Sequence, residues 1–419
     1  MRQYDEYMDT GVSWIGRIPK HWKLRRIKYI FSESTNKSTT GMELPLSLSK
    51  ELGVIPSSEK ANRTMESASY IGCKIVNPGQ IVFNRFKARL FAISNYNGVV
   101  SSDYAIYNCT DEANPKYMVW LFSTKMYRDA FDRKASGIGD GFSRLYTKDL
   151  FSMYSIFPPL SEQNTIVEFI KSKTLNIDTY VAERERELQL LNELKESEIA
   201  NIVTRGLNPN VEMKDSGIPW IGMIPAHWDV VRIKSILSES KEKTNEDGGT
   251  LLSLSQYTGI TLKENAKKVG MFEAESTIGY NVVHPGQFVM NIMLAWNGSY
   301  AVSDYEGVIS PAYSVFNFTT NCEKKYYHYL LRLPAYAGAF KTQSKGIIDS
   351  RLRLYPIYFL AFKTIVPPLE EQQAIVRYIE EKTNKVNSLI NELQAEIDYL
   401  KEYKEKLIAD CVTGQIKVD

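Results

Sequence analysis

The sequence contains two copies of one long unit, and this duplication constrains the fold more than any other feature. At an offset of 206 residues, 16 of the 26 positions in Asp9–Ser34 are identical to those in Asp215–Ser240. Further blocks, such as Pro158-Pro159-Leu160 and Pro367-Pro368-Leu369, match in the same order at an offset that reaches 209 residues. A unit of this length is far longer than the roughly 20–50 residues of a solenoid repeat. We therefore expect two homologous domains in one chain.

Each copy opens with a segment of mixed α and β character. Short β-branched and aromatic runs alternate with turn signals, and Asn77-Pro78-Gly79 is typical of a tight turn that leads into a strand. His284-Pro285-Gly286 has the same position in the second copy. The apolar spacing in Tyr117–Phe131 and Tyr326–Phe340 favours helices. The pattern predicts an α+β fold with two tandem globular domains.

The end of each copy predicts a single long helix. No Gly or Pro occurs between Leu160 and Gly206, or between Pro368 and Gly414. At ~1.5 Å per residue, a helix of this length extends over roughly 60 Å. Apolar residues recur at alternating steps of three and four residues, which is the pattern of a coiled-coil seam. The predicted pairing residues are Ile177, Val181, Leu188, Leu191, Val386, Ile390, Leu393, Ile397 and Leu400.

We expect the two helices to pair with each other as an antiparallel coiled coil, with pseudo-two-fold symmetry between the copies. An apolar seam needs a partner, and both copies carry the same seam. The alternative is that each helix packs on its own domain as an ordinary long helix. The predicted boundaries are 1–158 for the first domain, 159–205 for its helix, 206–214 for a linker, 215–366 for the second domain, 367–413 for its helix and 414–419 for a tail.

Charge is distributed unevenly, although the formal net charge is only +2. The segment Leu160–Thr204 has nine acids and five bases, and Leu369–Thr413 has ten acids and six bases. The rest of the chain therefore carries a net charge of +10. A basic globular part with interspersed aromatic residues is typical of nucleic-acid-binding proteins. The excess is modest, so solvated surface cations are the alternative interpretation.

Basic residues gather in loops at matching places in the two copies. In the first copy they lie in Arg85–Arg89 and on both sides of the Gly-rich stretch Gly137–Gly141, and in the second copy around Gly346. Arg and Lys bind phosphates, and Arg, Asn and Gln can also hydrogen-bond to base edges. The predicted DNA-binding residues are Arg85, Lys87, Arg89, Arg133, Lys134, Ser143, Arg144, Asn291, Trp296, Lys341, Lys345, Arg351 and Arg353.

The motifs do not indicate catalysis or a cofactor. Gly137–Gly141 lacks the Lys-Ser/Thr that completes a phosphate-binding loop, and no amino-methyltransferase signature occurs. His21 and His227 stand at equivalent positions beside Trp22 and Trp228, where a structural role is a better interpretation than a metal site. We expect neither a metal nor a cofactor in this chain.

The composition excludes several other classes of protein. Apolar residues make up 43% and charged residues 24% of the chain, which is an ordinary globular balance. No apolar run approaches the roughly 18 residues of a membrane-spanning helix, and the N-terminal residues lack a signal-peptide core. The four scattered cysteines contain no C-x-x-C pair, which favours a reducing compartment. We expect a cytoplasmic protein.

The repeated motifs resemble those of the specificity subunit of type I restriction–modification systems. The resemblance rests on the opening W-I-G-x-I-P-x-H-W, the P-G-Q turn before a strand, the R-L-Y and P-P-L-x-E-Q blocks, and the long helix that closes each copy. It covers nearly the whole chain. It implies that each copy is a target recognition domain followed by a spacer helix, and that each domain reads one half of a bipartite site in double-stranded DNA.

The same resemblance implies that this chain is not an enzyme. It implies two modification subunits that transfer methyl groups from S-adenosylmethionine to adenine, and two restriction subunits that use ATP and Mg²⁺. The helices would set the spacer between the half-sites and help to dock the modification subunits. In the second copy Ile292 and Trp296 replace Arg85 and Arg89, which suggests a different half-site. A coiled-coil scaffold without sequence-specific DNA binding and a self-contained methyltransferase are the alternatives.

Overall fold

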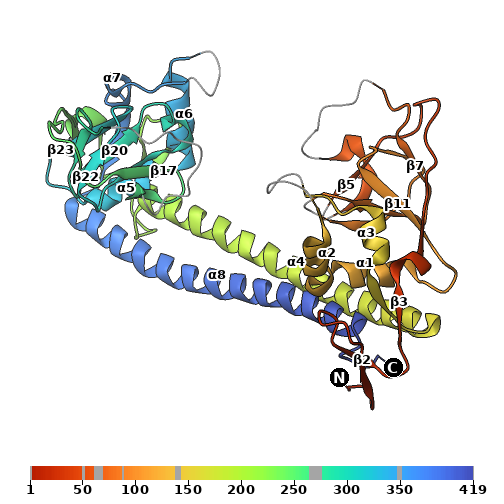
Figure 1. Ribbon diagram of the computed structural model, residues 1–419. Coiled ribbons are helices and arrows are strands. Elements are labelled where there is room, and N and C mark those ends of the chain that lie inside the picture. The colour runs from red at the N-terminus through yellow and green to blue at the C-terminus, as the bar shows by residue number, and fades with distance from the viewer. Residues whose placement is uncertain are drawn as a thin grey trace. The chain divides into compact units, whose positions relative to one another are not determined.

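The computed structural model describes residues 2–49, 52–60, 69–86, 89–136, 143–263, 276–346 and 352–418 (Figure 1). The chain forms two compact units whose boundaries fall inside the two long helices. Unit 1 consists of Met1–Glu185 and Gln394–Asp419, and unit 2 consists of Arg186–Leu393. Each unit therefore combines one α+β domain with half of the first long helix and half of the second.

Unit 1 is built around a four-stranded antiparallel sheet in the order β4-β11-β8-β9. The sheet strands are β4 (Phe31–Glu33), β8 (Ile81–Asn84), β9 (Phe91–Ile93) and β11 (Tyr104–Cys109). The two-stranded pairs are β1 (Tyr7–Asp9) with β2 (Arg17–Pro19), β3 (Lys23–Arg26) with β12 (Tyr154–Phe157), β5 (Leu46–Ser49) with β6 (Gly53–Pro56), and β7 (Lys74–Val76) with β10 (Gly98–Val100). The helices of this domain are α1 (Pro115–Ser123), α2 (Lys125–Lys134) and α3 (Thr147–Ser152), with short 3-10 turns η1 (Ile27–Tyr29) and η2 (Ser57–Glu59).

The core of unit 1 is rich in aromatic side chains that join the sheet to α1 and α2. Phe91 on β9 lies 5.2 Å from Phe122 of α1 and 5.7 Å from Phe131 of α2, measured between ring centroids. Asn114 begins α1, because its side-chain oxygen accepts hydrogen bonds from the backbone N–H groups of Lys116 and Tyr117. The covered side of the sheet thus faces helices, as in other α+β domains.

Unit 2 repeats this plan with the sheet order β16-β23-β20-β21. Its sheet strands are β16 (Leu237–Ser240), β20 (Phe288–Asn291), β21 (Tyr300–Val302) and β23 (Tyr313–Phe318). The pairs are β13 (Met213–Asp215) with β14 (Met223–Pro225), β15 (Asp229–Arg232) with β24 (Lys363–Val366), β17 (Leu252–Ser255) with β18 (Gly259–Leu262), and β19 (Asn281–Val283) with β22 (Gly307–Ile309). The helices are α5 (Lys324–Leu331), α6 (Pro334–Gln343) and α7 (Pro356–Phe359), with 3-10 turns η3 (Ile233–Ser235) and η5 (Ala295–Asn297).

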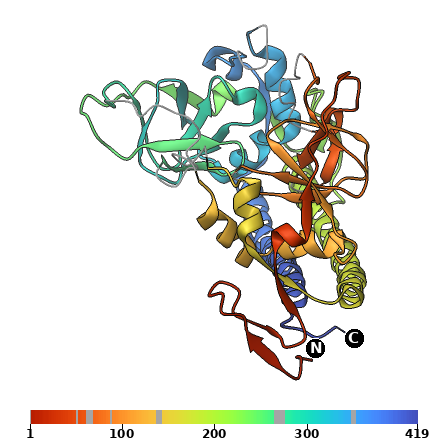
Figure 2. The same cartoon turned by 45° about the vertical axis from the view of Figure 1, so that its right-hand side comes forward.

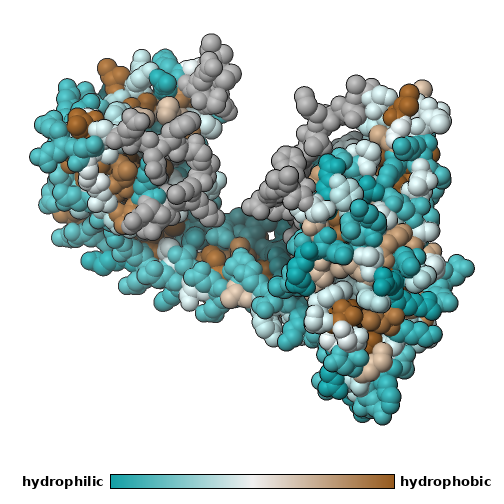
Figure 3. All heavy atoms as spheres, viewed as in Figure 1, coloured by the Kyte–Doolittle hydropathy of each residue, from teal (hydrophilic) through white to brown (hydrophobic). Residues whose placement is uncertain are grey.

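The two long helices are α4 (Leu160–Arg205) and α8 (Leu369–Val412), and they pair antiparallel in each unit. In unit 1, Lys404 bonds to Asp178 at 2.5 Å and Lys401 bonds to Glu185 at 2.8 Å, so the α8 number falls as the α4 number rises. In unit 2, Tyr378 donates to Glu198 at 2.8 Å. The predicted antiparallel coiled coil is confirmed, and the visible surface of the pair is mainly hydrophilic (Figure 3).

The seam of the helix pair is apolar but contains a polar contact in each unit, which we call the polar tie. Every predicted pairing residue, from Ile177 to Leu400, has a buried or half-buried side chain. Two lysines that are 209 residues apart, Lys195 and Lys404, also lie at half-buried seam positions. Lys195 donates to Asn387 at 3.1 Å, and Lys404 bonds to Asp178. Because polar seam residues can fix the alignment of a coiled coil, this repeated tie is suited to set the register.

Each domain is closed by the last turn of the helix from the other copy. In unit 1 the buried hydroxyl of Tyr117 donates to the carbonyl of Val412 at 2.8 Å. In unit 2 the equivalent Tyr326 donates to the carbonyl of Val203 at 2.8 Å. The last turn of each helix therefore docks on the domain of the other copy, an arrangement that the sequence did not indicate.

The glycines after these helices pack against the tryptophan of the repeated opening motif, which gives that tryptophan a structural role. Gly206 and Gly414 have φ values of +77° and +74°, a left-handed conformation that often terminates a helix. A Cβ atom at Gly414 would lie 2.9 Å from the Trp22 ring, and one at Gly206 would lie 3.2 Å from the Trp228 ring. The N-terminal and C-terminal segments meet beside this contact, where Lys417 N–H donates to the carbonyl of Arg2 at 2.9 Å (Figure 2).

In the described residues, no helix is both long and apolar enough to cross a membrane.

Removing the buried hydroxyl in Tyr117→Phe should loosen the end of α8 and not the end of α4. The carbonyl of Val412 would lose its side-chain donor, which costs about 1–2 kcal/mol, or about tenfold in the local opening constant. Hydrogen exchange measured by mass spectrometry should show about tenfold faster exchange in the last turn of α8. Tyr257→Phe, at a side chain that is 84% exposed, is the control and should leave exchange unchanged. Faster exchange at Val203 instead would contradict the assignment.

Candidate nucleic-acid interface

The predicted DNA-binding residues of each copy lie on two loops, or on the strand and helix ends next to them, and the loops share one backbone frame. The first loop follows β8 or β20, and the second connects α2 to α3 or α6 to α7. In unit 1, Leu145 N–H donates to the carbonyl of Arg85 at 3.0 Å, and in unit 2 Leu354 N–H donates to the carbonyl of Ile292 at 2.9 Å. The two copies therefore hold their loops together in the same way.

The base of the second loop is also closed identically in both copies. Ser136 and Arg144 exchange two backbone hydrogen bonds of 3.0 and 2.9 Å. Lys345 and Arg353 exchange the equivalent pair at 2.8 and 2.9 Å. The frame thus fixes where each loop begins and ends, while the side chains between these points differ.

An asparagine turns the chain at the start of the first loop. The side-chain oxygen of Asn84 accepts from Phe86 N–H at 2.9 Å, and that of Asn291 accepts from Met293 N–H at 3.0 Å. This is an Asx turn, which lets a short side chain substitute for a backbone partner. Asn291 was predicted to contact DNA, but the structure buries it as a support for the loop.

Arg89 is also a supporting residue in this structure. Its side chain is 4% exposed and pairs with Asp132 of α2 at 2.8 Å, and it donates to the Ser143 hydroxyl at 2.9 Å. Arg89 has a φ of +37°, which is uncommon for a residue other than glycine. The predicted site residues Arg89 and Ser143 therefore tie the two loops to each other and to α2.

The second copy replaces this ion pair with a cation–π contact. Trp296 occupies the position of Arg89, and Lys341 occupies the position of Asp132. The Lys341 ammonium lies 5.1 Å from the centre of the Trp296 ring, and Trp296 Nε1–H donates to the carbonyl of Met293 at 3.0 Å. Both pairs join the first loop to the helix that leads into the second loop, α2 or α6, so the contact persists although its chemistry changes.

Arg85 belongs to a half-buried cluster with an excess of positive charge. Its guanidinium lies 2.8 Å from Glu33 on β4, and the Lys74 ammonium lies 3.3 Å from the same carboxylate. Burial, followed by repulsion from Arg85, lowers the pKa of Lys74. Two cations against one carboxylate leave a net positive site beside the loop, which is suited to an anion. Sequence reasoning missed Glu33 and Lys74, because they lie far from Arg85 in the chain.

The other predicted cations lie closer to the surface. Arg133 and Lys134 are exposed in the last turn of α2, and Lys345 and Arg353 are exposed at the base of the second loop of unit 2. Arg144 lies 4.5 Å over the Phe86 ring and 3.8 Å from Asp103. Lys87 and Arg351 lie outside the residues that the structure describes. The exposed cations could contact phosphates of a nucleic acid without a change in the backbone.

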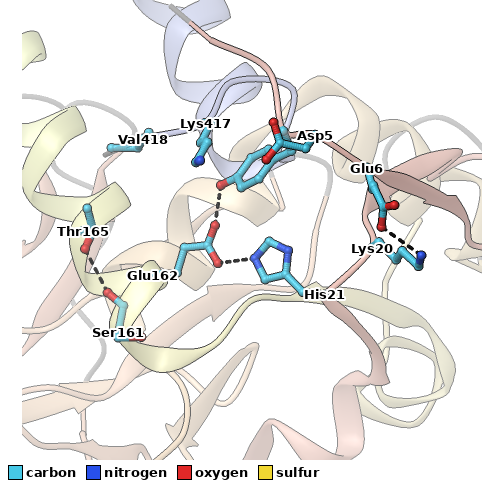
Figure 4. Close-up of a pocket in the computed structure, with 10 residues that line it drawn as sticks. Asp5, Glu6, Lys20, His21, Ser161, Glu162, Thr165, Lys417 and Val418 are labelled. Atoms are coloured by element: carbon cyan, nitrogen blue, oxygen red, sulfur yellow. Dashed lines mark hydrogen bonds and ion pairs between the residues drawn. The ribbon is translucent and has the colours of Figure 1, made fainter.

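A separate cavity of about 770 Å³ opens in unit 1 where α4 begins (Figure 4). His21 lies 2.8 Å from Glu162, and the Tyr4 hydroxyl donates to the same carboxylate. Burial, followed by the hydrogen bond to Glu162, raises the pKa of Tyr4 above its ordinary value. In unit 2, His227 lies 2.6 Å from Glu371. The repeated His–Glu contact therefore fastens each domain to the first turn of its own helix.

Among the described residues, no group of three or more His, Cys, Asp or Glu side chains is placed to hold a metal ion.

Two curated proteins of Methanocaldococcus jannaschii are similar to this chain in sequence. The type I restriction enzyme MjaVIII specificity subunit is 23% identical over 322 residues, which cover 72% of this chain and 70% of the relative. The putative type I restriction enzyme MjaX specificity subunit is 22% identical over 282 residues, which cover 62% of this chain and 59% of the relative. No protein-family model matches the chain.

Two solved structures have a similar fold. A chain from a study of complex assembly and conformational transition of a type I R-M system has a TM-score of 0.68 at 14% identity, and 95% of this chain and 99% of that chain are covered. The HsdS subunit from Thermoanaerobacter tengcongensis has a TM-score of 0.50 at 13% identity, with 97% and 100% covered. At these identities the similarity is one of fold.

The exchange of Arg89 and Asp132 for Trp296 and Lys341 can be tested as a double-mutant cycle. Asp132→Lys alone places a second cation beside the buried Arg89, and we expect the free energy of unfolding to fall by about 1–3 kcal/mol. The double variant Arg89→Trp/Asp132→Lys should be less destabilised than the sum of its single variants, by about 0.5–3 kcal/mol. Urea unfolding measures both quantities.

The control for this cycle is Asp129→Lys on the same helix. Asp129 pairs at 3.0 Å with Lys125, whose side chain is 85% exposed, so the change should stay within about 0.5 kcal/mol. Strictly additive single and double variants would show that the two positions are not coupled.

Proposed function

We propose that this chain, a homologue of type I restriction enzyme specificity subunits, recognises a bipartite DNA site with its two repeated domains. The relatives in sequence are specificity subunits, and the structural relatives share the fold over nearly the whole chain. The family resemblance predicted from the repeated motifs is therefore confirmed. The relatives support the specificity role and not the alternative of a scaffold without sequence-specific DNA binding.

The main support for this proposal is a comparison of the loops in the two copies, which would form two separate DNA-contacting surfaces, here called reading surfaces. The backbone hydrogen bonds that frame the loops are the same in both copies, whereas the side chains between them differ. Arg85 and Arg89 of the first copy correspond to Ile292 and Trp296 of the second. A constant frame with different side chains is what two domains need if they bind the same kind of polymer at different sequences.

The chain is the recognition component and not the catalytic one, as its relatives are specificity subunits. We propose that it carries no cofactor, and that partner subunits bind S-adenosylmethionine, ATP and Mg²⁺. The partners would be two modification subunits and two restriction subunits in the cytoplasm. One structural relative comes from a study of the complex assembly of a type I R-M system, which supports association with such subunits.

The helix pair would set the distance between the two half-sites. Its seam is continuous through each unit, and the Lys195–Asn387 and Lys404–Asp178 ties restrain sliding of one helix along the other. The long helices carry an excess of acids, so they would repel phosphates and suit protein partners better than DNA.

Replacing the Lys50–Asp149 region with that of another specificity subunit should change one half-site and leave the other unchanged. The chain, assembled with its modification subunit, is used to select duplexes from a random-sequence library. Binding of the selected duplex should weaken steeply as salt rises, because phosphate contacts release counterions. Equal affinity for all duplexes, or none, would overturn the proposed function. A change in both half-sites would overturn the modular interpretation.

Deleting seven residues from each helix should shorten the DNA spacer. Removal of Glu183–Gln189 and Glu392–Asp398 keeps the heptad phase and shortens the pair by about 10 Å, or about three base pairs. The same library selection should return both original half-sites with a shorter spacer. Glu183→Gln without a deletion is the control and should not alter the spacer. An unchanged spacer in the deletion variant would contradict the role of the helices.

A further inference from the structure

The reading surface of unit 2 is apolar at positions where the first copy is charged. The positions fall in two short blocks, 85–87 and 148–149, that match 292–294 and 357–358. Arg85, Lys87, Lys148 and Asp149 of the first copy correspond to Ile292, Leu294, Ile357 and Tyr358 of the second. Met293 stands where the first copy has Phe86. Four changes from charged to apolar on one surface need a physical reason, since apolar side chains exposed to water contribute nothing to folding.

Four exposed apolar side chains lie on the two segments that this frame joins, and we call them the apolar patch (Met293, Leu294, Ile357 and Tyr358). Met293 and Leu294 are each 38% exposed, and Ile357 is 74% exposed. The hydrogen bond from Leu354 N–H to the carbonyl of Ile292 joins the loop to the segment that leads into α7. Figure 3 shows exposed hydrophobic side chains over α7. Exposed apolar groups that gather in this way commonly mark a binding surface.

Basic residues predominate in the described segments on either side of the patch. Residues 332–346 and 352–366 contain no Asp or Glu, and their basic residues are Arg332, Lys341, Lys345, Arg353 and Lys363. Lys345 lies 5.1 Å over the ring of Tyr358, a member of the patch. Lys341 lies 5.1 Å over the Trp296 ring, whose Nε1–H donates to the carbonyl of Met293. An exposed apolar patch with lysines beside it suits an anionic partner that also exposes apolar groups.

Duplex DNA is such a partner, because it is anionic and exposes one kind of apolar group in its major groove. In the major groove, the C5 methyl of thymine is the apolar feature that the base edges present, between two rows of phosphates. We infer that the apolar patch of unit 2 contacts thymine methyl groups in one half-site, an inference that rests on the proposed function. The first copy has charges at the matching positions, so its half-site would be read without such a methyl contact.

Uracil substitution tests this inference, because uracil pairs like thymine and lacks only the methyl group. The probe is the duplex selected from the random library by the full chain with its modification subunit. Uracil replaces thymine in one half-site at a time, and equilibrium binding is measured at fixed salt. We expect about fourfold weaker binding for each contacted methyl in one half-site and no change in the other.

Variants assign the effect to the patch. In the quadruple variant Met293→Ala/Leu294→Ala/Ile357→Ala/Tyr358→Ala, thymine and uracil duplexes should bind with equal affinity, because every side chain of the patch that could meet the methyl is gone. Met223→Ala is the matched control, since Met223 is an exposed methionine of unit 2 that lies on β14, outside the patch. It should keep the full preference for thymine.

Each other outcome has a distinct meaning. A specific site whose affinity is unaffected by uracil in both half-sites would overturn the inference and leave the proposed function standing. A half-site pair made only of G·C base pairs would do the same. A thymine preference that survives in the quadruple variant would place the methyl contact elsewhere and also overturn the inference. Binding without any sequence preference would instead overturn the proposed function.

Discussion

The docking of each helix end on the domain of the other copy is the contact on which the rest of the structure depends. A buried tyrosine hydroxyl, Tyr117 or Tyr326, donates to the last carbonyl groups of α8 or α4. The following glycine then packs on Trp22 or Trp228. Because each domain also holds the first turn of its own helix through a His–Glu contact, both helices are fixed at both ends. The coiled-coil seam between these ends can then form only in antiparallel orientation.

This arrangement separates the parts of the chain that must stay constant from those that can vary. Helix docking and the loop frame use backbone groups and buried aromatic residues, which recur in both copies. Some loop side chains, such as Arg89 and Trp296, contact a side chain of the neighbouring helix, so such contacts can change in pairs. The exchange of Arg89 and Asp132 for Trp296 and Lys341 is such a paired change. Duplication therefore supplies two surfaces of the same geometry and different chemistry.

The candidate site was only partly predictable from the sequence. Cation-rich loops could be located because their flanking motifs repeat, and the structure brings Arg85, Arg144 and their neighbours together. Local sequence could not indicate that Arg89 and Asn291 are buried supports, since burial depends on residues far away in the chain. Asp132 is 43 residues from Arg89, and Glu33 is 52 residues from Arg85. A comparison of the two copies could have suggested the first of these pairs, because both of its members change together.

The sequence by itself determined the duplication, the α+β character of each copy and the two long helices with their seam. The duplication is visible when the sequence is compared with itself. The helices and the α+β character follow from local periodicity and from the positions of Gly and Pro, which act on residues close in the chain. Only the tertiary structure decided that α8 completes the first domain and α4 the second. The apolar last turns of both helices need a buried site, and the order of residues does not say which domain offers it. Hydrogen bonds across 295 and 123 residues, to Val412 and Val203, answer that question.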